Sequence, residues 1–476
     1  MSKYQFLDRR VPIEEGNIAI VQDLSKCKNC SLCRKACAVD MGVFDYYDLT
    51  TNGDHPICIH CGQCASICPF DSINERSEID EVKAAIADPN KIVVFQTAPA
   101  VRVGLGEEFG MDAGTFVEGK MVAALRKLGG DYVLDTNFGA DMTIMEEASE
   151  LVERALNGSG ELPQFTSCCP AWVKFAETFY PEFLPNLSTA KSPIAMQAPT
   201  QKTYFAEKMG IDAKQMVAVA VTPCTAKKFE IRRDEMNSSA EYWESPEMRD
   251  TDYCITTREL AKWLRAEEVN FDELEDSKFD PLMGEASGGG IIFGNTGGVM
   301  EAAMRTAYKL ITDKEPPPYA LTHLEDVRGM EGVKEATVQL GDDVTLSVAV
   351  VHGGKNTRDF LNALKDSDKH YDFIEVMACP GGCIGGGGQP RTKLPQAVKT
   401  KEARIGGLYE ADANYKWVAS YENPEIQALY KDFLGEPLGH KAHELLHTHY
   451  TDRSSVLGDR KDVTPEICPT SPKYKG

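Results

Sequence analysis

Three short motifs place cysteines where their thiolates could hold a metal centre. The stretch 375–390 has six glycines and two thiols that stand four residues apart. Residues 166–172 contain two adjacent thiols, and residues 222–228 contain one thiol three residues before a lysine. Thiolates at such spacings bind metal, and glycine lets the backbone approach a bulky inorganic group closely. A disulfide is the alternative, although this glycine density is unusual around a structural bridge. The five cysteines are Cys168, Cys169, Cys224, Cys379 and Cys383.

Two further cysteine runs near the N-terminus have the spacing of a two-cluster ferredoxin. Each run reads Cys-x2-Cys-x2-Cys-x3-Cys. In this pattern the first three thiolates of one run and the last thiolate of the other run bind the same [4Fe–4S] cube. Zinc is the alternative, but its ligands usually come as two separated pairs. Ala38 replaces the proline that usually follows the first run, which alters a turn and no ligand. We expect one cube on Cys27, Cys30, Cys33 and Cys68, and another on Cys58, Cys61, Cys64 and Cys37.

Composition excludes several classes of protein. The chain has 476 residues and a net charge of −22, and so acidic a protein is a poor binder of nucleic acid, whose phosphates need a basic face. No run of about 18 apolar residues could span a membrane. The first ten residues lack the apolar segment of a secretion signal, so we expect a cytoplasmic protein. Fifteen clustered cysteines favour metal ligation in a reducing compartment over a disulfide framework.

Strand-like and helix-like segments alternate after residue 90. This alternation indicates α/β architecture, with functional groups on loops at strand ends. We predict a two-[4Fe–4S] ferredoxin-like domain at 1–84, an α/β catalytic domain at 85–400 and a C-terminal wrapping extension at 401–476, an α+β and α/β fold overall. The predicted strands are 92–95, 132–134, 216–221, 346–352 and 373–377, and the predicted helix is 116–128.

Two other features carry weaker signals. The glycine-rich stretch 287–298 lacks the Gly-Lys-Ser/Thr ending of a phosphate loop and the dinucleotide fingerprint, so we predict a packing turn against the cluster pocket instead of a nucleotide site. The C-terminal histidines could bind a metal, but we expect them to lie on the surface or in packing contacts. They are His440, His443, His447 and His449.

The three catalytic motifs, in this order, resemble the active-site signatures of the iron-only ([FeFe]) hydrogenases. The resemblance covers nearly the whole chain and implies the reversible reaction 2H⁺ + 2e⁻ ⇌ H₂. Four thiolates from three segments suffice for a third cube, on Cys169, Cys224, Cys379 and Cys383. In that family the cysteine at the position of Cys383 bridges the cube to a diiron unit with carbon monoxide, cyanide and azadithiolate, and the two together form the H-cluster.

The resemblance also implies roles for residues around the cluster. Lys227 would donate to a cyanide, since a buried ammonium needs an anionic partner. Met377 would pack near the iron-bound carbonyls, with Phe293 as a wall, although ordinary core packing is the alternative for both. The rest of the pocket lining would be Ala98, Pro99, Ser192 and Pro193.

An acidic helix offers a route for protons. Residues 143–156 have apolar side chains at helical spacing, and at roughly 100° per residue Glu146 and Glu153 lie opposite that apolar face. Glu147 lies near its edge. Because adjacent side chains on an extended segment point to opposite sides, Cys168 and Cys169 should not both bind the cube. The resemblance implies that protons pass along Cys168, Glu147, Ser188 and Glu150, with Arg154 near the exit; a solvated acidic helix and an inert buried cysteine are the alternative.

The resemblance implies partners as well. Electrons would pass through the two N-terminal cubes to or from ferredoxin or flavodoxin, maturation proteins would supply the diiron unit, and the chain would be a monomer. A local positive patch beside the first cysteine run could receive an acidic carrier, with an ordinary solvated surface as the alternative. Its residues are Lys26, Lys28, Arg34 and Lys35.

Two other classes of protein share part of this sequence pattern. A hydrogen-sensing relative would carry a signalling domain and lack the relay cysteine, and an iron–sulfur assembly scaffold would lack the diiron site. Lys227 and the complete relay argue against the scaffold.

Strong hydrogen producers commonly have methionine at the position of Thr222, glutamine at that of Ile194 and, in some members, serine at that of Ala100. Such changes alter polarity around the cluster, so we expect a lean towards hydrogen oxidation, with simple repacking as the alternative.

Overall fold

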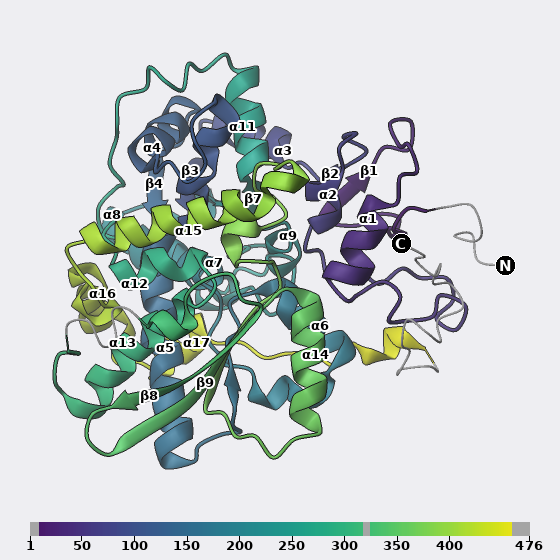
Figure 1. Cartoon of the computed structure of the whole chain (residues 1–476). Helices are drawn as coiled ribbons and strands as arrows, with labels where there is room; N and C mark the ends of the chain where they lie inside the picture. Colours follow the sequence, from purple (N-terminus) through teal and green to yellow (C-terminus); the bar gives the residue numbers. More distant parts are fainter. Residues whose placement is uncertain (1–8, 318–323, 459–476) are drawn as a thin grey trace.

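The computed structural model describes residues 9–317 and 324–458, and this part of the chain forms a small N-terminal module beside a larger body with two four-stranded sheets (Figure 1). In the N-terminal module, β1 (Ile20–Gln22) pairs antiparallel with β2 (Ile73–Glu75). Short helices α1 (Leu32–Lys35) and α2 (Gln63–Ile67) carry cysteines of the two runs. The strand pairing brings the two runs side by side around one apolar core.

The first large sheet is entirely parallel, in the order β4-β3-β6-β7. Its strands are rich in valine and alanine and are buried along most of their length, as expected for a parallel sheet covered on both faces. The strands are β3 (Ile92–Thr97), β4 (Tyr132–Asp135), β6 (Met216–Thr222) and β7 (Tyr253–Thr256).

The second large sheet has the order β5-β10-β9-β8, with β8 antiparallel at its edge. Its strands are β5 (Gln164–Phe165), β8 (Val333–Leu340), β9 (Val344–His352) and β10 (Phe373–Met377). The cysteine motifs follow the carboxyl ends of β5, β6 and β10, which is where parallel sheets usually place their functional groups.

Helices surround these sheets (Figure 1). The long α5 (Thr136–Asn157) packs against α7 and α13. The others are α3 (Ile79–Ala87), α4 (Glu118–Lys127), α6 (Pro170–Phe179), α7 (Pro193–Thr200), α8 (Ala206–Met209), α9 (Lys227–Glu230), α10 (Ser238–Tyr242), α11 (Thr257–Ala266), α12 (Gly288–Ile291), α13 (Gly298–Thr312), α14 (Gly354–Lys365), α15 (Ala397–Asn414), α16 (Pro424–Leu429) and α17 (His440–Leu446). Among the described residues, no helix combines the length and apolar character needed to cross a membrane.

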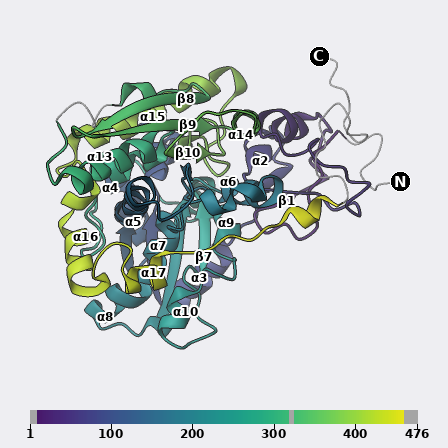
Figure 2. The ribbon, with the colours of Figure 1, turned by 90° about the horizontal axis from the view of Figure 1, so that it is seen from below.

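The C-terminal segment returns to the beginning of the chain. After α17 it crosses the molecule and ends in the short helix η13 (Ser454–Leu457) beside the N-terminal module (Figure 2). Leu457 is 2% exposed and packs in the same apolar core as Val11, Phe44 and Leu49. The last described segment therefore completes the core of the first module.

The predicted strands and the predicted helix at 116–128 are confirmed, with small differences at their ends. The stretch 287–298 is more helical than the predicted turn, since it contains α12 and the start of α13. A side chain at Gly290 would collide with the carbonyl of Asn137, so glycine there permits close packing on α5. The predicted boundaries at residues 84 and 400 both fall inside helices, α3 and α15.

Candidate active site

The three cysteine motifs meet around one cavity beneath the carboxyl ends of the strands. The five thiols Cys168, Cys169, Cys224, Cys379 and Cys383 line it. Its other walls are mostly apolar. Of the residues predicted to line the pocket, those that do so are Ala98, Pro99, Pro193, Lys227, Phe293 and Met377.

One predicted pocket residue lies elsewhere. Ser192 caps α7, its hydroxyl accepting from the Ala195 amide at 3.4 Å, and it borders a separate small cavity with Glu230 and Tyr450. A serine that precedes a proline at the first turn is a strong helix cap, and here this local role turns it away from the cysteines. Ser192 therefore does not line the cavity directly, whereas its neighbour Pro193 does.

Glycines permit the close approach of the loop that carries Cys379 and Cys383. Gly382 has a φ of 90°, which favours glycine, and an added Cβ there would lie 2.6 Å from the Thr296 amide nitrogen. Within the described residues, no group of three or more His, Cys, Asp and Glu could hold a single metal ion. The donor set and the glycine cradle therefore fit an iron–sulfur group with a second metal unit beside it.

Lys227 faces the cavity but has partners within the protein. Its ammonium donates to Glu230 Oε2 at 2.7 Å and to the Cys168 carbonyl at 3.2 Å. Burial opposes its charge, yet the Glu230 carboxylate and neighbouring thiols raise the pKa of Lys227 overall. The side chain therefore remains a cation, and three N–H donors leave one for a ligand in the cavity.

Cys168 lines this cavity, and Glu147 lies close enough to Cys168 for their charges to interact. Burial raises the pKa of the Cys168 thiol, and the Glu147 carboxyl raises it further. Burial also raises the pKa of Glu147 to about 8, with a contribution from Glu150. Glu147 is fully buried, and its Oε2 has no partner among the described residues. Both groups therefore hold protons near neutral pH.

The remaining predicted relay residues, Ser188, Glu150 and Arg154, are connected by hydrogen bonds. The Ser188 hydroxyl donates to Glu150 Oε2 at 2.6 Å, and Arg154 donates to Glu150 Oε1 at 2.6 Å. Arg154 also donates to the carbonyls of Glu161 and Leu187, which hold it at the end of α5. Hydrogen bonds thus join Ser188, Glu150 and Arg154, and Glu147 lies within electrostatic range of Cys168 and close to Ser188.

The C-terminal extension covers the face of α5 that lies opposite its predicted apolar face. Glu146, on that opposite face, is fully buried and accepts from Tyr430, the Leu438 amide and His447. Helical periodicity could not show that residues almost 300 positions later pack there. Glu153, which the periodicity also placed opposite the apolar face, is exposed.

The C-terminal histidines divide between surface and packing positions, as expected. His447 is buried, and its ring bonds to Thr189 as well as to Glu146. The other three, His440, His443 and His449, are exposed. Cys468, to which the sequence assigned no role, lies outside the described residues.

The N-terminal cysteine sets lie at different depths. Cys30 is exposed, whereas Cys61 lies close enough to Cys224 and Cys379 for their charges to interact. The first set therefore lies towards solvent and the second towards the cavity. Lys26, Lys28 and Lys35 are exposed around the first set.

Arg34 does not belong to that positive surface. Its side chain is buried, lies 3.9 Å from Asp45 and stacks over Phe44. Its inclusion in the predicted patch is wrong, because a cation inside a short cysteine run can turn inwards and pair locally.

Comparisons with known proteins agree with this arrangement. Residues 91–387 match the family described as iron only hydrogenase large subunit, C-terminal domain. The chain belongs to this family. Residues 398–453 match the iron hydrogenase small subunit, and residues 19–69 match a 4Fe-4S dicluster domain. This hydrogenase is therefore an oxidoreductase, and its family interconverts H₂ and protons at an H-cluster.

Relatives of known name span most of its length. Iron hydrogenase 1 of Clostridium pasteurianum is 43% identical, over 93% of this chain and 78% of its own. The NADP-reducing hydrogenase subunit HndD of Solidesulfovibrio fructosivorans is 44% identical, over 92% of this chain and 75% of its own. The structure of a Chlamydomonas reinhardtii [FeFe]-hydrogenase variant superposes with a TM-score of 0.69 at 41% identity, covering 79% of this hydrogenase and 99% of that chain. By contrast, the Bos taurus cytosolic iron-sulfur assembly component 3 is 31% identical, over 83% of this chain and 82% of its own.

Proposed function

We propose that this hydrogenase catalyses 2H⁺ + 2e⁻ ⇌ H₂ at an H-cluster held by Cys169, Cys224, Cys379 and Cys383. The observation that carries the proposal is the convergence of these thiols, from three separate segments, on one cavity beside Cys168 and Lys227. When bound there, a diiron unit with carbon monoxide, cyanide and azadithiolate would supply the chemistry of H–H bond formation and cleavage. Cys383 is the proposed bridge between the cube and that unit.

The protein's own residues would orient and isolate the unit. Lys227 offers a fixed N–H donor to an anionic ligand, where a charge-assisted hydrogen bond is strong. Apolar walls from Ala98, Pro99, Phe293 and Met377 keep bulk water away. Such surroundings stabilise diatomic ligands and set the reduction potential through polarity and hydrogen bonding.

We propose that protons pass between the cavity and the surface along Cys168, Glu147, Ser188 and Glu150, with Arg154 at the outer end. The hydrogen bonds of Ser188 and Arg154 to Glu150, the burial of these residues and the raised pKa of Glu147 support this role. A carboxyl that keeps its proton near pH 7 can donate it and take another without leaving a long-lived buried charge. The burial of Glu147 and Glu150 also favours the relay over the alternative of a solvated acidic helix.

We further propose that two [4Fe–4S] clusters carry the electrons, one on Cys27, Cys30, Cys33 and Cys68 and the other on Cys58, Cys61, Cys64 and Cys37. The exposure of Cys30 suits the first cluster to exchange with a soluble carrier, ferredoxin or flavodoxin. Such carriers are acidic, and Lys26, Lys28 and Lys35 offer the complementary charge. Maturation proteins would deliver the diiron unit, and the chain would act as a monomer.

The proposed bias is towards hydrogen oxidation. Ala100, Ile194 and Thr222, which distinguish this chain from strong producers, all line the cavity. Thr222 also accepts a hydrogen bond from the Cys224 amide at 3.3 Å, so its hydroxyl is tied to the loop of a proposed ligand.

Infrared spectroscopy of protein produced together with its maturation proteins tests the central proposal. We expect bands of iron-bound CO and CN⁻, and their loss when Cys383 is replaced by alanine. Cys254→Ala is the matched control, because this cysteine is fully buried but does not border the cavity. Matured wild-type protein without these bands would contradict the proposed H-cluster, whatever its iron–sulfur content.

A further inference from the structure

The loop that carries Cys61 touches the loop that carries Cys224 through one buried hydrogen bond. The Thr225 hydroxyl donates to the His60 carbonyl at 2.6 Å. Thr225 is fully buried and His60 is 2% exposed, so water does not compete for this bond. Since His60 adjoins Cys61 and Thr225 adjoins Cys224, the bond joins the direct neighbours of two proposed ligands that belong to different clusters.

Glycines bring the same loops into close contact. A side chain at Gly62 would collide with the Thr225 hydroxyl, and one at Gly387 would collide with the Cys61 carbonyl. Gly62 also has a φ of 68°, which other residues rarely adopt. The absence of side chains at these two positions allows the backbones to meet directly, although Gly387 adds only a packing contact and no hydrogen bond to Cys61.

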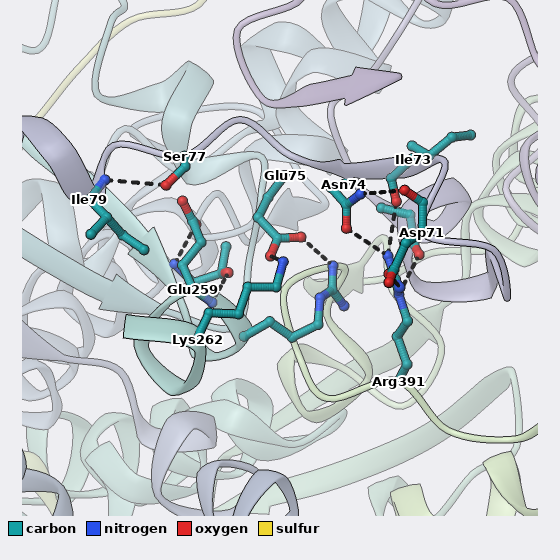
Figure 3. Close-up of polar contacts among 12 residues, drawn as sticks. Asp71, Ile73, Asn74, Glu75, Ser77, Ile79, Glu259, Lys262 and Arg391 are labelled. Atoms are coloured by element: carbon teal, nitrogen blue, oxygen red, sulfur yellow. Dashed lines mark hydrogen bonds and ion pairs between the residues drawn. The ribbon is translucent and has the colours of Figure 1, made fainter. Parts of the chain in front are cut away.

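Polar contacts hold this meeting point in place. Arg258 of α11 donates to the Gly387 carbonyl at 2.6 Å and to Glu75 of the N-terminal module at 2.8 Å. Around it, Lys262 also binds Glu75, and Arg391 binds Asp71 and Asn74 of the same module (Figure 3). The N-terminal module is thus fixed to the catalytic part beside the contact between Thr225 and His60.

His60 is also fixed from its other side. Its ring Nε2 lies 2.7 Å from the Lys174 ammonium of α6. The ring packs against Phe229 at a tilt of 31°, with 4.8 Å between the ring centroids. The carbonyl that accepts from Thr225 therefore belongs to a residue whose side chain is also held by contacts.

We propose that the Thr225 hydroxyl is an electronic bridge between the cluster held by Cys61 and the cluster held by Cys224. The proposal rests on the proposed function, in which electrons pass between these clusters. In each event one electron leaves one side of the bridge and one electron arrives on the other, while no bond breaks and no proton moves. Electronic coupling falls steeply across gaps between unbonded atoms, so the hydrogen bond gives this route an advantage over the packing contact at Gly387.

Two substitutions at Thr225 separate the bridge from simple packing. Thr225→Val keeps the shape but removes the donor, whereas Thr225→Ser keeps the donor. The measurement is the rate of electron transfer between the two clusters after rapid reduction of the protein. Freeze-quench EPR monitors this transfer. Iron content and the reduction potentials of the clusters are determined in parallel. We expect unchanged iron and potentials, a severalfold slower transfer in Thr225→Val, and a rate near that of wild type in Thr225→Ser.

The controls make the outcomes distinct. Thr203→Val removes another fully buried hydroxyl that donates to a carbonyl, Pro199 at 2.7 Å, and should leave the rate unchanged. An unaltered rate in Thr225→Val with intact clusters would overturn the bridge. If that variant loses iron, Thr225→Ala compared with Thr225→Ser decides the same question. Wild-type protein in which no electron passes between the clusters would instead contradict the proposed electron route.

Discussion

The imidazole Nε2 of His447 lies 3.0 Å from the Glu146 carboxylate, on the face of α5 that points away from the catalytic cavity. The other ring nitrogen, Nδ1, lies 2.8 Å from the Thr189 hydroxyl, and Thr189 in turn binds Glu150. The C-terminal extension is therefore bonded to the helix that carries the proposed proton relay. It covers the outer side of that helix and fixes its position relative to the cavity.

Replacing His447 should loosen this attachment. His447→Ala leaves Glu146 buried without one of its partners, and an unsatisfied buried group costs about 1–3 kcal/mol. We expect a lower thermal midpoint and faster protease cleavage near α17. His440→Ala serves as the control, because its side chain is 89% exposed and should have little effect. Equal stability of the two variants would show that the extension is held by other contacts.

Replacing Cys168 should separate proton transfer from cluster binding. Cys168→Ala should keep all iron but lose nearly all turnover, because a methyl group cannot pass a proton to Glu147. Cys168→Asp should recover part of the activity, since a carboxyl group can carry a proton. The measurements are iron content and the rate of H₂ production with a small dye. Loss of iron in Cys168→Ala, with iron retained in Cys169→Ala, would mean that the two adjacent cysteines have exchanged roles.

The protonation of Glu147 should follow pH with a midpoint of about 8. Its pKa in the folded protein lies above the ordinary value of 4.5, so the folded state binds this proton more tightly than the unfolded state does between these values. The resulting stabilisation is complete below about pH 4.5 and is lost as pH rises through about 8. Infrared difference spectra should show a protonated carboxyl band at pH 7 that disappears above pH 8 and is missing in Glu147→Gln. A band that disappears near pH 4.5 would refute the raised pKa.

Reversing charge beside Cys30 should weaken exchange with an acidic carrier. Lys28→Glu with Lys35→Glu should slow electron transfer to ferredoxin and flatten its dependence on salt, because opposite charges no longer guide the encounter. Reaction with a small neutral dye should change little. The matched control reverses Lys127 and Lys214, which are also exposed but lie in the catalytic part, so the net charge changes equally. Equal slowing by both pairs would assign the effect to total charge and not to a docking surface.

Introducing methionine at position 222 should shift the balance between hydrogen oxidation and hydrogen production. Thr222→Met replaces a hydroxyl that accepts from the Cys224 amide with a soft thioether that faces the cavity. We expect the ratio of oxidation to reduction current in protein-film voltammetry to fall. A change of about 1.4 kcal/mol in the energy of one intermediate would alter relative rates roughly tenfold. Identical current ratios in wild type and variant would remove Thr222 from the account of bias.

The sequence was sufficient for features that depend on local spacing. Cysteine runs, the pocket cysteines and the strands before them obey short-range rules, and these are the parts of the fold that agree with the predictions. The surroundings of Glu146, Arg34 and Ser192 did not follow from the sequence, for a common reason. Their surroundings are set by residues distant in the chain or by a competing local bond. Helical periodicity and a count of charges carry no information about either. Thr225 stood inside a recognised motif, but its partner His60 is 165 positions away and gave no signal.

The burial of Leu457 in the core of the N-terminal module has a consequence for synthesis of the protein. Residues 9–75 leave the ribosome before Leu457 does, and this side chain of their apolar core arrives almost 400 residues later. At typical elongation speeds of about 5–20 residues per second, this gap lasts on the order of tens of seconds. During that time the module that receives two of the proposed iron–sulfur clusters must keep an apolar site open. A cluster inserted before Leu457 has been synthesised would therefore enter a module with an incomplete apolar core. A cluster inserted afterwards would enter a module whose core is complete.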